Sequence, residues 1–280
     1  MSIEVRVFMM FRSAMNLRNS LVLLGALALG ACASSDPSEL AFEEVPAEKL
    51  YAQGLTAMDS GDDSLARKKF EELDRQHPYS NFARRSMVLS AYNAYRQGDY
   101  SESVSSAKRF IALYPSDEDV PYAYYLIGQS YYRQIPEVTR DQEAAERAMM
   151  AMNELVQRYP DSEYASDARK KIRITMDQLA GKEMQIGRYY LERKEYIAAA
   201  NRFKLVVKDF QTTRHVEEGL MRLAQTYLAM GIVHEAQTAV AVLGHNFPES
   251  KWYKQAYSML TKDGLQPEVN KGSWMSKIFS

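Results

Sequence analysis

A short pattern that ends one helix and starts the next occurs five times along this chain of 280 residues. An aromatic residue or histidine precedes a proline in four of the copies, and a potential helix cap follows two positions later. Proline ends a helix because it lacks an N–H and its ring clashes with the preceding turn. A Ser, Thr or Asp oxygen accepts hydrogen bonds from the first free N–H groups of the next helix. The pattern therefore predicts five junctions between helices and an all-α fold. The copies are His77-Pro78-Tyr79-Ser80, Tyr114-Pro115-Ser116-Asp117, Tyr159-Pro160-Asp161-Ser162, Phe210-Gln211-Thr212-Thr213 and Phe247-Pro248-Glu249-Ser250.

Small residues recur at fixed distances from these junctions. Four of the junctions are preceded, 17 residues earlier, by a turn at Gly61, Gly98, Lys194 and Gly231. Seven positions before each turn stand Gly54, Ala91, Gly187 and Ala224, and Gly128 holds the corresponding place in the third copy. Five positions after each turn stand Ala66, Ser103, Ala199 and Ala236. Short side chains at such positions let neighbouring helices approach closely, so each copy predicts one pair of helices in contact.

This pattern resembles the tetratricopeptide repeat, whose unit is two antiparallel helices, and the resemblance covers about residues 46 to 261. The first two prolines are 37 residues apart, slightly more than the usual repeat of about 34. Helix pairs of this kind bury their faces only by stacking. The resemblance implies a right-handed superhelix of five helix pairs with a concave groove.

Two repeats break the period. The third has eight extra residues around 135–142, where Pro136 forbids a continuous helix, and we expect a protruding loop with Asp141 as a candidate helix cap. The fourth has 14 extra residues before Gly187, almost four turns at about 3.6 residues per turn. We expect one long first helix, from about Glu163 to Leu191, that projects beyond the stack. Whether it breaks at Gly181 stays open.

Cys32 is the only cysteine, and it closes the run Leu29-Gly30-Ala31-Cys32 behind a basic lead and a short apolar stretch. These are the parts of a secretory signal, and the ending resembles a lipoprotein signal, which implies that Cys32 carries diacylglycerol and an N-acyl chain. The apolar run, Leu21 to Ala31, would span only about 16 Å as a helix, too short for a hydrocarbon core of about 30 Å. Translation can start at Met1 or Met15. The predicted parts are a signal peptide at 1–31, a flexible tether at 32–45, the repeat domain at 46–262 and a tail at 263–280.

Composition and motifs argue against several function classes. The formal net charge is −1, so no basic excess indicates nucleic acid. The four histidines show no metal-ligand spacing, and no nucleophile, phosphate-loop or dinucleotide motif is present. We therefore expect neither an enzyme nor a cofactor, and the function is assigned to surfaces.

The richest candidate surface is a group of tyrosines between 122 and 132. With residues of the preceding repeat they could line a groove for an extended peptide, although packing between repeats remains the alternative. Met149, Met150 and Met152 are interpreted as core. Near the end, Trp274, Met275, Ile278 and Phe279 share one side of a helix, and we expect them to dock on the protein itself or on a partner rather than form a frayed tail. The candidate groove residues are Tyr92, Asn93, Arg96, Tyr124 and Tyr125.

The lipoprotein signal, the repeats and several short sequence motifs together resemble those of the BamD/ComL family, lipoproteins of the outer-membrane β-barrel assembly machine. The motifs are Arg109-Phe110-Ile111-Ala112-Leu113-Tyr114-Pro115, Tyr122-Ala123-Tyr124-Tyr125-Leu126-Ile127-Gly128, Arg140-Asp141-Gln142, Arg158-Tyr159-Pro160-Asp161-Ser162-Glu163-Tyr164-Ala165 and Ala199-Ala200-Asn201-Arg202-Phe203. The resemblance implies a periplasmic scaffold, anchored by lipid in the outer membrane and working with a BamA-like barrel subunit and other assembly-machine lipoproteins. Its C-terminal repeats would bind the barrel subunit and its N-terminal groove would receive unfolded outer-membrane proteins.

Arg202 and Phe203 are the candidate partner-binding residues. Ala33, rather than Asp, follows Cys32, which by analogy with other lipoproteins favours the outer membrane. Gln211 in place of the fourth proline and the apolar tail depart from the family pattern. The alternative is a tetratricopeptide lipoprotein that pilots secretin or pilus assembly or coordinates peptidoglycan enzymes.

Overall fold

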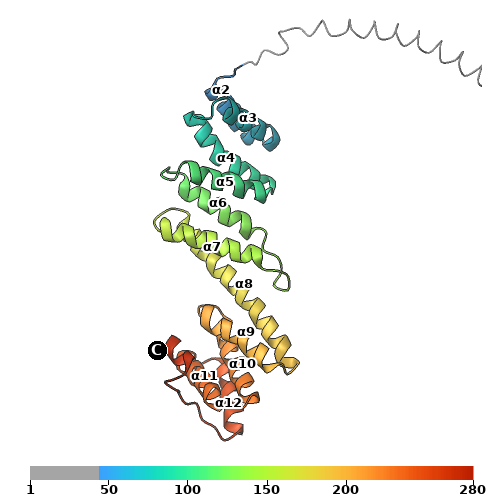
Figure 1. Cartoon of the computed structure of the whole chain (residues 1–280), viewed down its shortest axis with the longest axis vertical. Helices are drawn as coiled ribbons and strands as arrows, with labels where there is room; N and C mark the ends of the chain where they lie inside the picture. The colour runs from blue at the N-terminus through green and yellow to red at the C-terminus, as the bar shows by residue number, and fades with distance from the viewer. Residues whose placement is uncertain (1–43, 280) are drawn as a thin grey trace, which may run out of the picture. The chain divides into compact units, whose positions relative to one another are not determined.

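The computed structural model describes residues 44–279, and every regular element among them is an α-helix (Figure 1). The predicted signal peptide, Cys32 and residues 33–43 of the predicted tether lie outside the described residues. Within 44–279, no helix combines the length and apolar character needed to cross a bilayer. The helices are α2 (Ala47–Asp59), α3 (Asp63–Gln76), α4 (Asn81–Gln97), α5 (Tyr100–Leu113), α6 (Val120–Tyr132), α7 (Glu143–Arg158), α8 (Ala165–Glu192), α9 (Tyr196–Asp209), α10 (Val216–Ala229), α11 (Val233–Asn246), α12 (Lys251–Lys262) and α13 (Trp274–Ile278).

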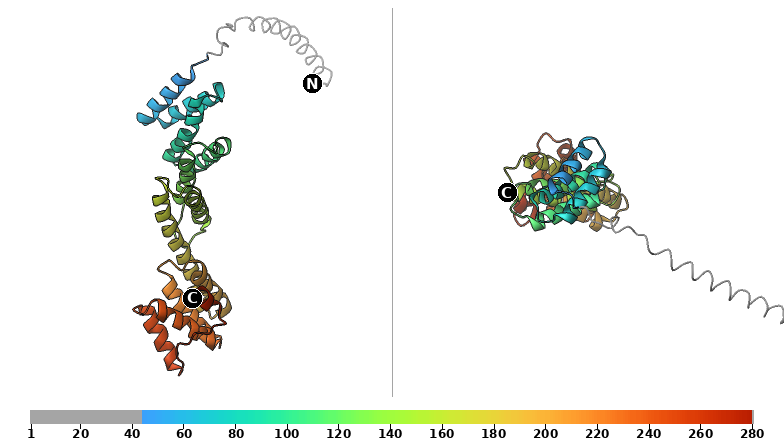
Figure 2. Two further views of the ribbon diagram at one scale, coloured as in Figure 1. Left: turned by 90° about the vertical axis from the view of Figure 1, so that its left-hand side faces the viewer. Right: turned by 90° about the horizontal axis from the view of Figure 1, so that it is seen from above.

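The helices pack in pairs that follow the chain order. Helix α2 packs on α3, α4 on α5, α6 on α7, α8 on α9 and α10 on α11, and each pair also contacts the next one. Helix α12 closes the series against α10 and α11. Within the compact unit that begins at Pro46, successive pairs stack along one direction (Figure 2). The predicted all-α stack of helix pairs is confirmed.

Glycines mark the closest helix contacts, as the repeat pattern predicts. A Cβ added to Gly54 would lie 2.3 Å from a ring carbon of Phe70, and one added to Gly187 would lie 2.5 Å from a ring carbon of Phe203. Real Cβ atoms do not approach other atoms so closely, so the two helices of each pair meet where one side chain is missing. The small residues that recur in the sequence therefore mark the places where an aromatic ring of the second helix packs on the first.

The turns inside four of the pairs use the left-handed backbone region. Gly61, Gly98 and Gly231 have φ values of 80°, 79° and 73°. Lys194 occupies the same place in the fourth pair with φ of 59°. Glycine has no Cβ and enters this region without steric cost, whereas a lysine there is strained.

Three of the five predicted helix caps, Asp117, Ser162 and Thr213, are wrong. Ser80 and Ser250 do accept hydrogen bonds from the N–H groups of Ala83 and Trp252. In contrast, the Ser162 hydroxyl is buried without a hydrogen-bond partner, and the Thr213 hydroxyl donates to the Phe210 carbonyl. An additional turn of chain delays the start of α6, α8 and α10 by about three residues beyond the predicted caps. Asp117 likewise precedes α6, and its carboxylate accepts from the N–H of Asp119.

The long helix predicted in the fourth repeat is confirmed, and it passes Gly181 without a break. Its first half contributes Ala168 and Ile172 to a hydrophobic cluster with α4 to α7. Its second half contributes Met184 and Tyr190 to a separate cluster with α9 to α13. The prediction that α8 projects beyond the stack is wrong, because it connects two hydrophobic clusters.

The loop predicted to protrude from the third repeat instead packs along the middle of α8. The Gln178 side chain donates to the Pro136 carbonyl at 3.0 Å, and Lys182 donates to the Thr139 carbonyl at 2.7 Å. The extra residues of the third repeat thus cover the extra turns of the fourth. Asp141 accepts from the N–H of Glu143 at 2.9 Å, but the cap position itself is held by Gln142.

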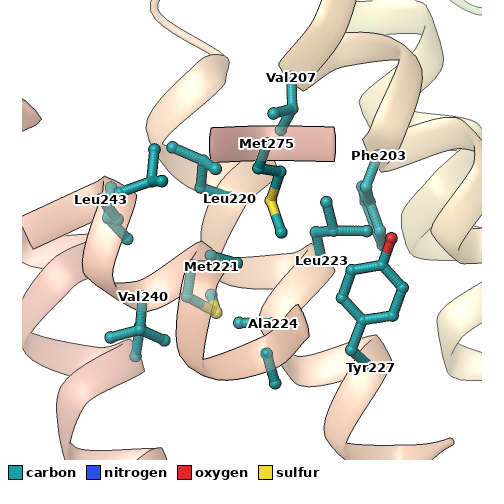
Figure 3. Close-up of a cluster of buried hydrophobic side chains, with 14 of the residues drawn as sticks. Phe203, Val207, Leu220, Met221, Leu223, Ala224, Tyr227, Val240, Leu243 and Met275 are labelled. Carbon is teal, nitrogen blue, oxygen red and sulfur yellow. The ribbon is translucent and has the colours of Figure 1, made fainter. Parts of the chain in front are cut away.

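The C-terminal tail docks on the protein itself. Met275 is fully buried, and Figure 3 shows its side chain among those of Leu220 and Leu223 from α10. The Trp274 indole N–H donates to the Tyr227 hydroxyl at 3.4 Å. The docking predicted from the spacing of the apolar residues is confirmed, and the tail covers the end of the helix stack.

Candidate functional site

The first helices of successive pairs bring tyrosines together in one cleft, which we name the tyrosine cleft. Its volume is about 470 Å³, within the usual range of about 300–1,000 Å³ for binding sites. Helix α4 contributes two residues, α6 and the turn after it contribute most of the rest, and α8 contributes one lysine. The lining residues are Tyr92, Tyr95, Tyr122, Tyr125, Leu126, Gln129, Tyr132, Arg133 and Lys171.

The aromatic rings of the cleft touch in series. Tyr92 and Tyr122 have ring centroids 6.4 Å apart, and Tyr164 lies 5.1 Å from both Tyr122 and Tyr125. Tilted rings at these separations attract one another and hold a fixed aromatic wall. Burial raises the pKa of Tyr122, and it raises the pKa of Tyr164 to about 12. These hydroxyls therefore stay protonated at neutral pH and can donate hydrogen bonds.

A polar network at Asp167 fixes the floor of the cleft. The Tyr125 hydroxyl donates to Asp167 at 2.6 Å, Gln129 donates to the same oxygen at 3.3 Å, and Lys171 forms an ion pair with it. Burial alone would raise the pKa of Asp167, but the hydrogen bonds from Lys171 and Tyr125 hold it below its ordinary value. Asp167 is thus a neutralised structural anion.

Only part of the predicted groove assembles. Tyr92 and Tyr125 both line the tyrosine cleft. Arg96 lies at its edge, 5.9 Å from the ring of Tyr92, and forms an ion pair with Asp63 at 3.4 Å. These three residues can contribute to one surface.

The other two predicted groove residues do not face the cleft. Asn93 is 1% exposed, and its side chain donates to the Asp63 carbonyl at 2.8 Å. It therefore holds the start of α3 against α4. Tyr124 points towards α7, where its hydroxyl donates to Glu154 at 3.2 Å. One step along a helix turns the side chain by about 100°, which separates Tyr124 from Tyr125. The prediction of a single groove that includes Asn93 and Tyr124 is wrong.

The predicted groove lacked Lys171, which lines the cleft, and Tyr164, whose ring packs on tyrosines of the cleft. Lys171 and Tyr164 come from the start of α8 and the turn before it, and they meet α6 only because α8 packs beside it. The regular spacing of the first helices could have indicated these residues. Tyr92 of α4 and Tyr125 of α6 lie on the face that becomes the cleft, so residues of α8 on the same face were expected to line it.

The predicted partner residues have different positions. Phe203 is completely buried against Gly187, so it cannot contact a partner, and its assignment as a partner-binding residue is wrong. The Arg202 side chain is 43% exposed and forms an ion pair with Glu183 at 3.0 Å. On the same helix, Ile197 near its start and Leu205, about one turn after Arg202, are 71% and 39% exposed. We name Ile197, Arg202 and Leu205 the α9 face.

The lining of the tyrosine cleft is suited to binding a peptide. Among residues 44–279, no group of three or more His, Cys, Asp or Glu side chains could hold a metal ion. Aromatic rings, one amide and two cations can receive apolar side chains and polar backbone groups of a peptide.

Comparison with known proteins identifies similar chains. A family model, YfiO, described as outer membrane lipoprotein, matches residues 43–243. The chain is similar to the outer membrane protein assembly factor BamD of Caulobacter vibrioides, with 46% identity over 89% of this chain and 81% of that protein. It is also similar to the assembly factor BamD of Rickettsia prowazekii, with 36% identity over 87% of this chain and 96% of that protein. Among solved structures, the TPR domain of P58(IPK) aligns with a TM-score of 0.40 and 16% identity over 76% of this chain and 55% of that one.

Proposed function

Because the chain belongs to the YfiO family of outer membrane lipoproteins, whose curated relatives are named outer membrane protein assembly factor BamD, we propose that it is a non-enzymatic scaffold in the assembly of outer-membrane proteins. The family match over residues 43–243 carries the proposal. The tyrosine cleft supplies the surface for substrates, and the α9 face supplies the surface for the barrel-forming partner.

In this function the tyrosine cleft holds extended segments of barrel proteins before they fold. Such segments carry apolar side chains and unpaired backbone groups, which aggregate when left exposed. The rings of Tyr92 and Tyr122 provide apolar contact area, and the cation of Arg133 attracts carboxylates. Contacts of this kind are sequence-tolerant, as a general assembly factor requires.

A binding measurement tests the cleft. The probe is a fluorescent peptide from the C-terminus of a β-barrel protein, titrated with the mature chain. Replacing Tyr95 by Glu should weaken binding about tenfold, the equivalent of about 1.4 kcal/mol, because it removes a ring and places a carboxylate next to Arg133, which donates to the Tyr95 hydroxyl at 3.0 Å. Tyr79→Glu is the matched control, since Tyr79 is fully exposed and lies outside the cleft. Equal affinities of the two variants for the peptide would contradict a substrate role of the cleft.

The α9 face is the proposed contact for a BamA-like barrel subunit. Exposed apolar residues together with a charged residue on one helix are the composition expected of a specific interface. In a mild-detergent pull-down, Arg202→Glu and Ile197→Glu should lose the barrel subunit, whereas Ile174→Glu, a control at another exposed isoleucine, should retain it. Retention by all three variants would refute this assignment. Co-purification of secretin, pilus or peptidoglycan proteins without a barrel subunit would favour the alternative function.

Attachment to the membrane is proposed to rest on lipid at Cys32. The Cys32→Ala variant should be lost from the outer-membrane fraction. Its melting temperature should not change, since the first of the described helices begins at Ala47. A lowered melting temperature would show that the anchor also stabilises the fold.

A further inference from the structure

A second groove opens on a different side of α6 from the tyrosine cleft. Its floor is formed by Tyr124, Ile127 and Tyr131 of α6, and its walls are formed by α5 and α7. Its volume is about 620 Å³. We name it the α5–α7 groove. Tyr124 and Tyr125 are neighbours in sequence, yet they line different hollows of the protein.

The α7 side of the groove carries a large apolar side chain that is not buried by the helix stack. Met150 lies on the groove and is 63% exposed, so its interpretation as core is wrong. Leu113, at the end of α5, is 54% exposed. A flexible thioether on a rim adapts to varied apolar partners and is common on surfaces that bind helices. Exposure of large apolar side chains beside a hollow is typical of an interaction site.

The equivalent hollow between the preceding pairs is smaller, with a volume of about 110 Å³, and an ion pair bridges two of its lining residues. There Arg109 of α5 forms an ion pair with Asp74 of α3 at 2.9 Å. No ion pair joins α5 to α7 among the described residues, and the ammonium group of Lys108 has no ion-pair or hydrogen-bond partner there. Arg147, on the α7 side, pairs with Glu143 of its own helix and lies 5.7 Å from the ring centroid of Tyr131. The groove is therefore left open, with a cation without a partner on its α5 side.

We propose that the α5–α7 groove binds a short acidic amphipathic helix of a partner protein. The apolar face of that helix would cover Met150 and Ile127, and one of its carboxylates would pair with Lys108. From Arg147 to Glu154 the groove follows α7 for about 10 Å, which is about two turns of a docked helix. A helix fits this groove because α5 and α7 form its walls, and the side-chain ridges of a docked helix pack into the groove between two helices.

A pair of designed peptides tests the proposal. The acidic probe is a fluorescein-labelled helical peptide with leucines on one face and glutamates on the other, and its twin carries lysines in place of the glutamates. We expect the mature chain to bind the acidic probe and to bind the lysine twin at least about tenfold more weakly. Lys108→Glu and Met150→Glu should each weaken the binding of the acidic probe about tenfold, as measured by fluorescence anisotropy.

Two controls separate this groove from other surfaces. Lys68→Glu reverses an exposed charge on α3, and Tyr95→Glu alters the tyrosine cleft. Both should bind the acidic probe with the affinity of the unmodified chain. The proposal is overturned if the acidic probe does not bind, if its lysine twin binds equally well, or if Lys108→Glu and Lys68→Glu lower the affinity by the same factor.

Discussion

Two glycines of α8 should respond in opposite ways to the same substitution. In a helix interior, Gly→Ala gains about 1 kcal/mol of stability from backbone propensity alone. At Gly181 the added Cβ would meet the ring of His215 at 3.4 Å, an ordinary contact, so the gain should be realised. At Gly187 the added Cβ would lie 2.5 Å from a ring carbon of Phe203.

The magnitude follows from the burial of Phe203. Its ring is completely buried in the cluster of α9 to α13, so it can move away from Gly187 only by displacing other core side chains. Such overpacking costs about 1–3 kcal/mol. Because both substitutions share the same propensity gain, the free energies of unfolding of Gly181→Ala and Gly187→Ala should differ by about 1–3 kcal/mol.

Urea unfolding of the mature chain, followed by circular dichroism, measures this difference. The slope of the free energy with urea concentration should be unchanged, so the shift appears in the midpoint. Adding Phe203→Leu to Gly187→Ala should recover part of the loss, which a double-mutant cycle would report as coupling. If both alanine variants are stabilised equally, the ring has room to move and the argument for a tight helix contact fails.

Three further changes test other parts of the structure. Lys194→Gly should raise the free energy of unfolding by about 0.5–1 kcal/mol, measured in urea, because Lys194 is the only non-glycine residue among 44–279 with positive φ. Met275→Ala should lower it by about 2–5 kcal/mol, since Met275 is fully buried, whereas Ser276→Ala at the next position should change it little; equal effects would show that the tail does not dock as described. Burial lowers the pKa of His215, against the opposing effect of Asp177, so the unfolded chain binds protons more readily than the folded one. Stability should therefore fall as the pH drops below about 6.5, and His215→Gln should lose less over this range in thermal unfolding at a series of pH values.

The helix pairs could be predicted from local rules. Proline at the junctions, glycine in the turns and small residues such as Gly54 opposite Phe70 each act within one repeat. Because the same signals recur at the same spacing in each repeat, an error in one helix boundary does not shift the boundaries of the next repeat. Both ends of the long helix α8 agree with the sequence-based prediction to within two residues. The predicted caps at Asp117, Ser162 and Thr213 failed because an extra turn at the junction depends on how the next pair packs.

The functional surfaces could be predicted only in part. The sequence indicated that tyrosines of the first helices form a binding surface, but it assigned Tyr124 and Tyr125 to one groove. Each residue advances the side chain by about 100°, so a small rotation of α6 decides which tyrosine faces α8 and which faces α7. That rotation is set by packing against both neighbours, as is the exposure of Met150.

The sequence by itself determined that this chain is a stack of helix pairs with a lengthened fourth repeat, because the signals for pairs and junctions lie within a few turns of each other. Only the tertiary structure decided that the 133–142 loop covers α8 and that Met275 closes the C-terminal cluster. These contacts join residues far apart in the chain, such as Pro136 and Gln178, and no local pattern specifies them. The division into a tyrosine cleft and a separate α5–α7 groove follows from the same long-range packing.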